Sequence, residues 1–250
     1  DRSPSRGLGD VYKRQEVQAL SDVNFTVEKG EYVAIMGESG SGKTTLLNIL
    51  AALDKPTGGE VVLDGRALGT IPEREIAAFR RSQLGFVFQE FNLLDTFSVQ
   101  DNIFLPLVLA GRPYTEMAAR LAPIARQLGI AELLQKFPYE LSGGQKQRVA
   151  VARALITQPK LVLADEPTGA LDSRATDELL RLFEEINRDG QTILMVTHSV
   201  KAASHASRVL FIKDGEVFHE IYRGESTDEQ LYQKISDTLT MLATGGERHA

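Results

Sequence analysis

Short apolar runs alternate along the chain with longer segments in which apolar residues recur at helical spacing. The runs have the length of β-strands and are bounded by polar or turn-forming residues. The strands expected in this way are residues 31–36, 86–88, 161–164, 192–196 and 209–212. Because helical segments separate most of these strands, we expect an α/β fold with a mainly parallel sheet.

Shorter patterns complete this outline. Residues 60–63, followed by Leu-Asp-Gly at 63–65, indicate part of a small antiparallel sheet. Residues 209–212 and 216–218 flank a Lys-Asp-Gly turn and predict a β-hairpin. A helix is expected over residues 42–52, directly after a glycine-rich segment. No repeat or linker divides the chain in two.

A helical lobe is expected from about residue 91 to residue 150, inserted into the α/β core. Ser98 and Asp101 have the spacing of a capping box, which predicts a helix start. The helical pattern of residues 115–128 ends at Gly129, a common residue just beyond a helix.

The most apolar stretch is FVFQEFNLLDTFSVQDNIFLPLVLAG at residues 86–111, where Gln89 is the one polar residue placed for chemistry. The side chains expected to pack inside the lobe are Ile103, Phe104 and Leu107. Phe91, Leu93 and Leu94 directly follow Gln89, and a soluble monomer gains nothing by exposing them. We expect these three residues to contact a partner protein, and the alternative is that they pack in the core of the lobe.

The tail from residue 227 carries apolar residues at helical spacing: Leu231, Ile235, Leu239 and Leu242. We expect this tail, residues 227–250, to pack on the domain itself, with docking on a partner as the alternative.

Composition narrows the class of protein. The hydrophobic fraction of 42% and charged fraction of 25% are those of an ordinary globular protein. A net charge of −6 offers no basic surface to nucleic acid or anionic lipid. The absence of cysteine fits a reducing compartment, and no apolar run approaches the roughly 20 residues of a membrane helix. We therefore expect a soluble, cytoplasmic protein.

The first fifteen residues, DRSPSRGLGDVYKRQ, have no helical or strand period. They look like a translated sequencing adapter, and our hypothesis is that residues 1–15 replaced a native amino-terminal strand. The alternative is a natural terminus without regular structure.

The segment GESGSGKTT, Gly37 to Thr45, matches the pattern G-x-x-x-x-G-K-[ST] and lies between an apolar strand and a helix. The glycines let backbone N–H groups wrap a phosphate, and the helix start adds partial positive charge. Lys43 is placed for β- and γ-phosphates, and the Thr44 hydroxyl for Mg²⁺. The pattern predicts a nucleotide site.

Two further strands end in polar groups. LVLADEP places Asp165 and Glu166 after an apolar strand, a pairing that suits a Mg²⁺ ligand and a general base that polarises water. ILMVTH ends in His198, which we expect to sense the γ-phosphate. Ligands of open α/β sheets bind beyond the carboxyl ends of the strands, so these groups should converge on the glycine-rich loop. We expect His205, His219 and His249 to be surface residues.

LSGGQ begins a second helix with an anion-binding start. Ser142 is a good N-cap, and Gly143 and Gly144 expose backbone N–H groups. The chain thus has two expected phosphate-binding sites, the loop at residues 37–45 and the helix start at LSGGQ, and a single domain of this size needs a reason to have both.

GESGSGKTT, FVFQE, LSGGQKQR, LVLADEPTGALDS and MVTH occur in the order and spacing of ABC-type ATPase domains, which the chain resembles from about residue 17 to 215. The resemblance implies a P-loop NTPase core with a small antiparallel subdomain and an inserted helical lobe, over residues 16–226. It also implies a homodimer in which two subunits meet head to tail and close on ATP, which explains the two phosphate sites.

The resemblance assigns the site residue by residue. Lys43, Gln89, Glu166 and His198 would be catalytic, and Thr44, Gln89 and Asp165 would hold Mg²⁺. The residues implied to bind ATP are Gly37, Glu38, Ser39, Gly40, Ser41, Gly42, Lys43, Thr44, Thr45, Ser142, Gly143, Gly144, Gln145 and Asp172. Asp172 would lie at the dimer interface, and Tyr12 is at a plausible distance to stack on adenine.

One position departs from the common pattern, which reads Ser-Ala-Leu-Asp where this chain has Gly169, Ala170, Leu171 and Asp172. With the preceding EPTG, this variant resembles the branch of lipoprotein-release, macrolide-export and bacitracin-type peptide-export ATPases. QEFNLLDTFSVQDNIFLPL and FIKDGEVFHEIYRG are most similar to bacitracin-type members, which work against antimicrobial peptides.

The leading function is therefore an ATP-hydrolysing subunit on the cytoplasmic side of the membrane, bound to a separate transmembrane permease and through it to a possible sensor kinase. A non-transporting ATPase that signals to a membrane partner, as in cell division, uses the same motifs and stays open. A chromosome-maintenance ATPase is excluded, because only about a hundred residues separate the phosphate loop from LSGGQ. The acidic balance also opposes DNA binding.

Overall fold

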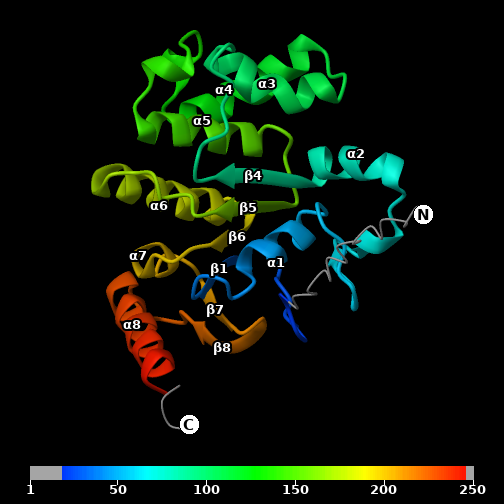
Figure 1. The fold of residues 1–250 in the computed structure, drawn as a ribbon. Helices are drawn as coiled ribbons and strands as arrows, with labels where there is room; N and C mark the ends of the chain where they lie inside the picture. Colours follow the sequence, from blue (N-terminus) through cyan, green and yellow to red (C-terminus); the bar gives the residue numbers. More distant parts are fainter. Residues whose placement is uncertain (1–18, 246–250) are drawn as a thin grey trace, which may run out of the picture.

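The computed structural model of the protein describes residues 19–245. The segment 1–15, Tyr12 and His249 lie outside this range. Six strands form one twisted sheet in the order β4-β5-β6-β1-β7-β8 (Figure 1). The strands are β1 (Tyr32–Gly37), β4 (Leu84–Phe88), β5 (Leu161–Asp165), β6 (Thr192–Val196), β7 (Arg208–Lys213) and β8 (Glu216–Tyr222).

Neighbouring strands from β4 to β7 run parallel, and only β8 is antiparallel, as the partner of β7 in the hairpin. A second, two-stranded antiparallel sheet pairs β2 (Val62–Leu63) with β3 (Arg66–Ala67). The expected α/β fold with a mainly parallel sheet and a small antiparallel sheet is confirmed.

Alternate residues of β1 enter two separate cores. Tyr32, Ala34 and Met36 pack into a cluster under the later helices, whereas Val33 and Ile35 pack into a cluster with α1 (Lys43–Leu50). The period of two along a strand sends successive side chains to opposite faces, so a strand covered on both faces is apolar throughout. This explains why the run at residues 32–36 shows no polar alternation.

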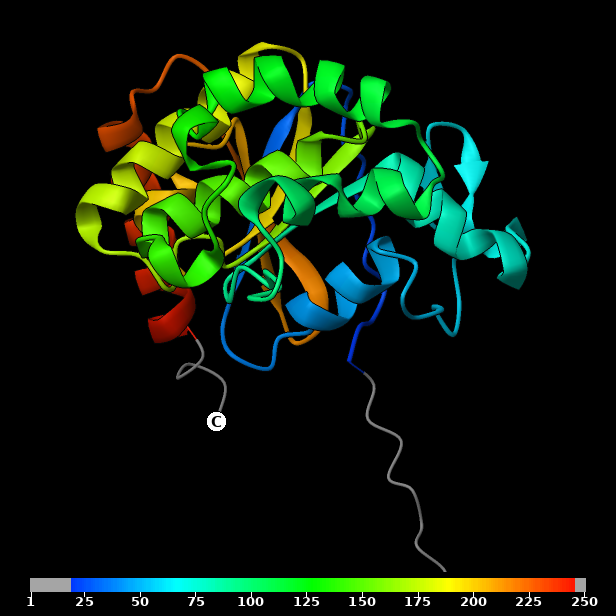
Figure 2. The ribbon, with the colours of Figure 1, turned by 90° about the horizontal axis from the view of Figure 1, so that it is seen from above.

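The helical lobe lies at the β4 end of the sheet (Figure 1). Helices α3 (Val99–Leu109) and α4 (Tyr114–Gln127) both contact α5 (Gly143–Leu155), and Figure 2 looks down on the lobe. The other elements are α2 (Glu73–Gln83), α6 (Ser173–Arg188), α7 (Val200–Ala203), α8 (Asp228–Gly245) and the short turns η1 (Leu68–Thr70), η2 (Ala131–Leu133) and η3 (Pro138–Glu140).

The first helix of the lobe begins at Val99 and not near residue 91. Phe91 and Asn92 have φ angles of +59° and +49°, in the left-handed region, which no α-helix contains. Ser98 then caps α3 by accepting a hydrogen bond from the Asp101 backbone N–H, as the sequence predicts. Residues 91–97 therefore form an irregular loop between β4 and α3.

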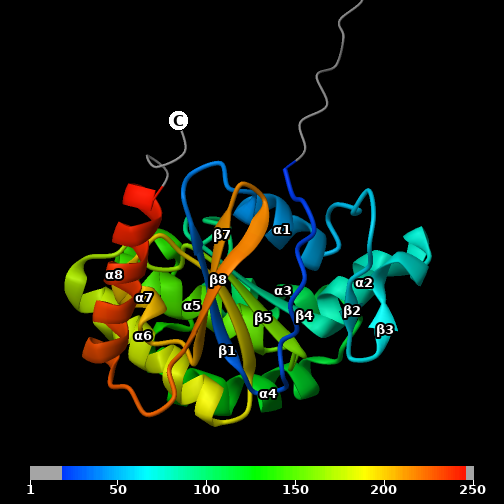
Figure 3. The ribbon, with the colours of Figure 1, turned by 90° about the horizontal axis from the view of Figure 1, so that it is seen from below.

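The tail packs on the domain, as expected. Leu231 and Ile235 of α8 are completely buried in the core, and Leu239 and Leu242 pack against it. Burial of each such side chain stabilises the fold by about 1.5–3 kcal/mol. Figure 1 shows α8 and the β7–β8 hairpin at the opposite end of the molecule from the lobe, and Figure 3 looks at the molecule from that end.

The expectation that His205 is a surface residue is wrong. Its side chain is only 13% exposed, and its Nδ1 lies 2.7 Å from Glu184 of α6 and 3.8 Å from Asp228 at the start of α8. Arg223 pairs with the same Asp228. A histidine between two acids from distant segments ties α8 to the domain, and no local pattern in the sequence indicates that pairing. His219, on β8, is exposed as expected.

Candidate functional site

The carboxyl ends of β5, β6 and β1 lie side by side at one edge of the sheet. Ile35 and Asp165 both pair with Val196 in the sheet register. The glycine-rich loop follows β1, Asp165 ends β5, and His198 follows β6 by two residues. The structure thus brings together the three groups that the sequence predicts to converge.

The loop at residues 37–45 is built to receive an anion. Gly42 has a φ of +97°, which favours glycine, and it precedes α1 without any side-chain cap. The N–H groups at the start of α1 are therefore free to bind a phosphate. The Lys43 Nζ donates to the backbone oxygens of Gly37 (2.9 Å) and Glu38 (2.6 Å). Burial lowers the pKa of Lys43, and the nearby Glu166 and Asp165 oppose that shift.

Glu166 is held in a strained conformation beside this loop. Its φ is +44°, and its backbone N–H donates to the Val196 oxygen at 2.9 Å. One carboxylate oxygen, Oε2, accepts a hydrogen bond from the Thr197 hydroxyl at 3.1 Å. The other, Oε1, is buried without a hydrogen-bond donor among residues 19–245 and lies 3.4 Å from His198 Nε2. A buried oxygen with spare acceptor capacity can hold a water molecule.

The carboxyl groups of this site prefer the neutral form more than ordinary acids do. Burial raises the pKa of Glu166, and His198 and the Thr197 hydrogen bond act in the opposite direction. Burial also raises the pKa of Asp165, against the effects of Lys43 and His198. A raised pKa brings a carboxylate closer to the strength that a general base needs near neutral pH.

Gln89 follows β4, whose last residue, Phe88, pairs with Asp165. The Gln89 side chain is exposed at the same edge of the sheet. Gln89 and the acids therefore lie on neighbouring strands.

Sequence reasoning missed two α5 residues that fix this region. Gln147, completely buried, donates through Nε2 to the backbone oxygens of Phe88 (3.2 Å) and Pro167 (2.6 Å). Arg153 donates to the oxygens of Phe91 (2.8 Å) and Asn92. One helix thus holds the end of β4, the loop that follows it, and the turn after Glu166. A lone arginine within the apolar half of α5, VAVARAL, was the available signal.

The LSGGQ segment begins α5, as expected. Ser142 and Gln145 form a reciprocal capping box, with the Gln145 N–H donating to the serine hydroxyl at 3.3 Å. Ser142 and Gly144 line a hollow of about 720 Å³ together with Asp172, the N-cap of α6. None of the residues that line this hollow comes from the loop at residues 37–45. A single subunit therefore holds two separate polar surfaces.

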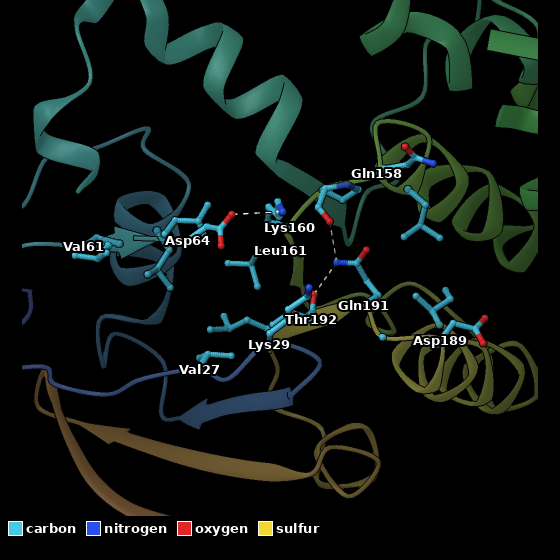
Figure 4. Close-up of a pocket in the computed structure, with 18 of the residues that line it drawn as sticks. Val27, Lys29, Val61, Asp64, Gln158, Lys160, Leu161, Asp189, Gln191 and Thr192 are labelled. Atoms are coloured by element: carbon cyan, nitrogen blue, oxygen red, sulfur yellow. Dashed lines mark hydrogen bonds and ion pairs between the residues drawn. The ribbon is translucent and has the colours of Figure 1, made fainter. Parts of the chain in front are cut away.

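A larger cavity, of about 1250 Å³, lies elsewhere (Figure 4). It is lined by Leu161 and Thr192, the first residues of β5 and β6, and by Val27 and Asp64. This is the amino edge of the parallel strands, opposite the glycine-rich loop. Because ligands of such sheets bind at the carboxyl edge, the larger cavity is not the candidate site.

Residues 20–169 match the family model for ABC transporters, and this match identifies the family of the chain. The chain belongs to the ABC transporter ATP-binding family. The ABC ATPase is 50% identical to the ABC transporter ATP-binding protein YxdL of Bacillus subtilis (strain 168), over 94% of this chain and 92% of YxdL. It is 44% identical to the bacitracin export ATP-binding protein BceA of Halalkalibacterium halodurans, over 95% of this chain and 93% of BceA.

A solved structure agrees with this assignment. The dimeric post-hydrolysis state of the ATP-binding cassette MJ0796, bound to ADP and Pi, has a TM-score of 0.73 and 41% sequence identity. The similarity covers 82% of the ABC ATPase and 90% of that chain. The ABC ATPase is thus an ATP-hydrolysing domain of a membrane transporter. Between residues 19 and 245 it has no helix with the length and apolarity to span a bilayer.

Proposed function

We propose that this ABC ATPase is the energy-supplying subunit of an exporter that protects the cell from antimicrobial peptides. It acts as a homodimer on the cytoplasmic side of the membrane, docked on a transmembrane permease. The observation that carries the proposal is the end-to-end similarity to BceA, a bacitracin export protein, at 44% identity. The ATPase domain comprises residues 16–226, with the lobe at about 91–150 and a tail at 227–250.

In the proposed reaction, Glu166 is the general base for the water that attacks the γ-phosphate. Its raised pKa supports this role, as does its buried Oε1, which has no hydrogen-bond donor among residues 19–245 and lies 3.4 Å from His198 Nε2. Lys43 and His198 stabilise charge on the phosphate oxygens, and Gln89 orients the water. The oxygens of Thr44, Gln89 and Asp165 are the ligands that Mg²⁺ prefers, and they would hold it. When bound, Mg²⁺ supplies positive charge against the phosphates.

The second polar surface serves the partner subunit's nucleotide. Ser142, Gly143, Gly144 and Gln145 at the start of α5 would approach ATP held by the loop of the other subunit, with Asp172 at the interface. The similarity to a dimeric cassette, MJ0796, supports the dimer that this arrangement requires. The Ser142 hydroxyl now accepts from Gln145, and closure would bring a phosphate to the same helix start.

The loop between β4 and α3 is the proposed contact with the permease. Leu94 is 44% exposed and Phe97 is 39% exposed, whereas Phe91 and Leu93 are half-buried. The exposed Leu94 and Phe97 lie on the same loop that begins after Gln89, so contact at this surface can reach the site. Phe91 and Leu93 are thus each partly exposed and partly packed against the domain, and we assign the partner contact to Leu94.

Glu166→Gln tests the catalytic proposal. The variant should bind ATP, form a stable dimer in size-exclusion chromatography, and release phosphate at least about a hundredfold more slowly than the parent. Glu229→Gln, an exposed position on α8, is the matched control and should keep the parent rate. Hydrolysis by Glu166→Gln at the parent rate would remove Glu166 from the base role.

Leu94→Asp tests the partner contact. In a complex with the permease from the same locus, it should abolish peptide-stimulated ATPase and leave the thermal midpoint of the isolated subunit unchanged. Leu53→Asp, at a position 56% exposed and outside the loop, should retain stimulation. Unfolding of the Leu94→Asp subunit would instead assign Leu94 to the lobe core.

A further inference from the structure

The side chain of Gln89 lies in the space that a side chain at position 169 would occupy. A Cβ atom placed on Gly169 would come within 2.9 Å of Gln89 Cδ, 3.1 Å of Nε2 and 3.2 Å of Cγ. Real Cβ atoms essentially never approach a neighbour as closely as the first of these distances. Any residue other than glycine at position 169 therefore displaces the Gln89 side chain.

Glycine is needed at position 169 because it has no side chain, and not because the backbone there has an unusual conformation. Its φ is not in the positive region, so other residues can adopt this backbone without strain. The three nearest atoms to its virtual Cβ all belong to Gln89. By contrast, a Cβ at Gly37 or Gly85 would meet backbone atoms. A substitution at Gly169 is thus accommodated by movement of one flexible side chain.

The two contacting segments are held at a fixed separation. Gly169 closes the turn that follows Glu166, because its N–H donates to the Glu166 oxygen at 2.9 Å. The buried Gln147 donates both to Phe88, the residue before Gln89, and to Pro167 in that same turn. The end of β4 and the turn after β5 are therefore fixed to each other through α5. Gln89 meets Gly169 across this fixed gap.

We propose that Gly169 is a positioning residue that seats the Gln89 side chain against the turn carrying Glu166. The inference rests on the proposed role of Gln89 in hydrolysis and deepens it. With glycine at this position, the chain keeps the space open for the glutamine amide. The space beside Gly169 sets the orientation of the Gln89 side chain towards the attacking water, and Gly169 takes no part in nucleotide binding.

Gly169→Ala and Gly169→Ser test the proposal in the 250-residue chain. Each should lower kcat for ATP hydrolysis by about tenfold, with KM for ATP changed by less than about twofold, because only the orientation of Gln89 is lost. In a Gln89→Ala background, Gly169→Ala should cause no further loss. The controls are Gly58→Ala and Gly69→Ala, because a Cβ at either position meets no atom within 4 Å.

A second measurement does not depend on turnover. The side-chain NH₂ resonances of Gln89, assigned by their loss in Gln89→Ala, should shift in Gly169→Ala and stay in place in Gly58→Ala. Unshifted resonances overturn the proposal, as does parent kcat in Gly169→Ala or an equal loss in the Gln89→Ala background. If the parent itself hydrolyses no ATP, the proposed function fails, and the resonances alone decide whether Gly169 seats Gln89.

Discussion

Asn102 is the buried polar side chain that organises the loop between β4 and α3. It is completely inaccessible to solvent. Its Oδ1 accepts from the Leu94 N–H at 2.8 Å, and its Nδ2 donates to the oxygens of Leu94 (3.0 Å), Phe97 (3.2 Å) and Ser98 (3.0 Å). One amide therefore replaces the regular hydrogen bonds that an irregular loop lacks.

Asn102→Ala removes all four hydrogen bonds at once. Because the Nδ2 amide has two hydrogens, its three contacts count as about two full hydrogen bonds. A neutral hydrogen bond contributes about 1 kcal/mol to the free energy of unfolding, so with the bond from Leu94 their sum is about 3 kcal/mol. Leu94 and Phe97 are partly exposed, and water can replace some of these bonds, which leaves an expected loss of about 2–3 kcal/mol. For a chain of this length, that loss lowers the thermal midpoint by about 5–10 °C.

Differential scanning calorimetry or circular dichroism at pH 7.5 measures the shift. Asn102→Asp should be at least as destabilising, because it keeps the acceptor for Leu94 but turns a buried carboxylate oxygen towards the backbone oxygens that Nδ2 now contacts. The matched control is Asn24→Ala, since the Asn24 side chain bonds only Asp22 and is exposed. A midpoint for Asn102→Ala within 1 °C of the parent would refute this account of the loop.

Two further predictions concern α5 and the site. Arg153→Lys should accelerate hydrogen exchange of the Leu94 amide roughly tenfold, because lysine lacks the planar fork whose two nitrogens donate separately to the Phe91 and Asn92 oxygens. Arg126→Lys, at an exposed position, should leave this exchange unchanged. Glu166→Gln should raise the thermal midpoint at pH 8, since burial raises the pKa of Glu166 above its unfolded value and the native carboxylate then costs stability. That gain should shrink as the pH falls through the raised pKa, and an equal midpoint for parent and variant at pH 8 would contradict the reasoning.

The convergence of the phosphate loop, Asp165, Glu166 and His198 could be predicted because it depends on local information. Each group follows an apolar run, and parallel strands place their carboxyl ends at one edge. Ser142 and Ser98 also cap their helices as the sequence predicts, because a cap involves residues only three positions apart.

Contacts across long sequence separations could not be predicted in this way. Arg153 meets a loop 61 residues earlier, and Gln147 meets Phe88 across 59 residues. His205 pairs with Glu184 only because the fold brings the segment after α7 beside α6. The irregular start of the lobe depends on the left-handed backbone of Phe91 and Asn92. Asparagine adopts this conformation more often than most residues, but phenylalanine does not, so the apolar pattern alone does not indicate it.

The position of β4 in the sheet has a mechanical consequence. Among the described strands it pairs with β5 alone, so it is an edge strand, and the helical lobe continues from its end. Displacing an edge strand disturbs one ladder of hydrogen bonds, whereas displacing β5 or β6 would disturb two. A force applied through the lobe would thus reach Gln89 along an edge strand, while Asp165, which ends β5, stays in a strand that is held on both sides.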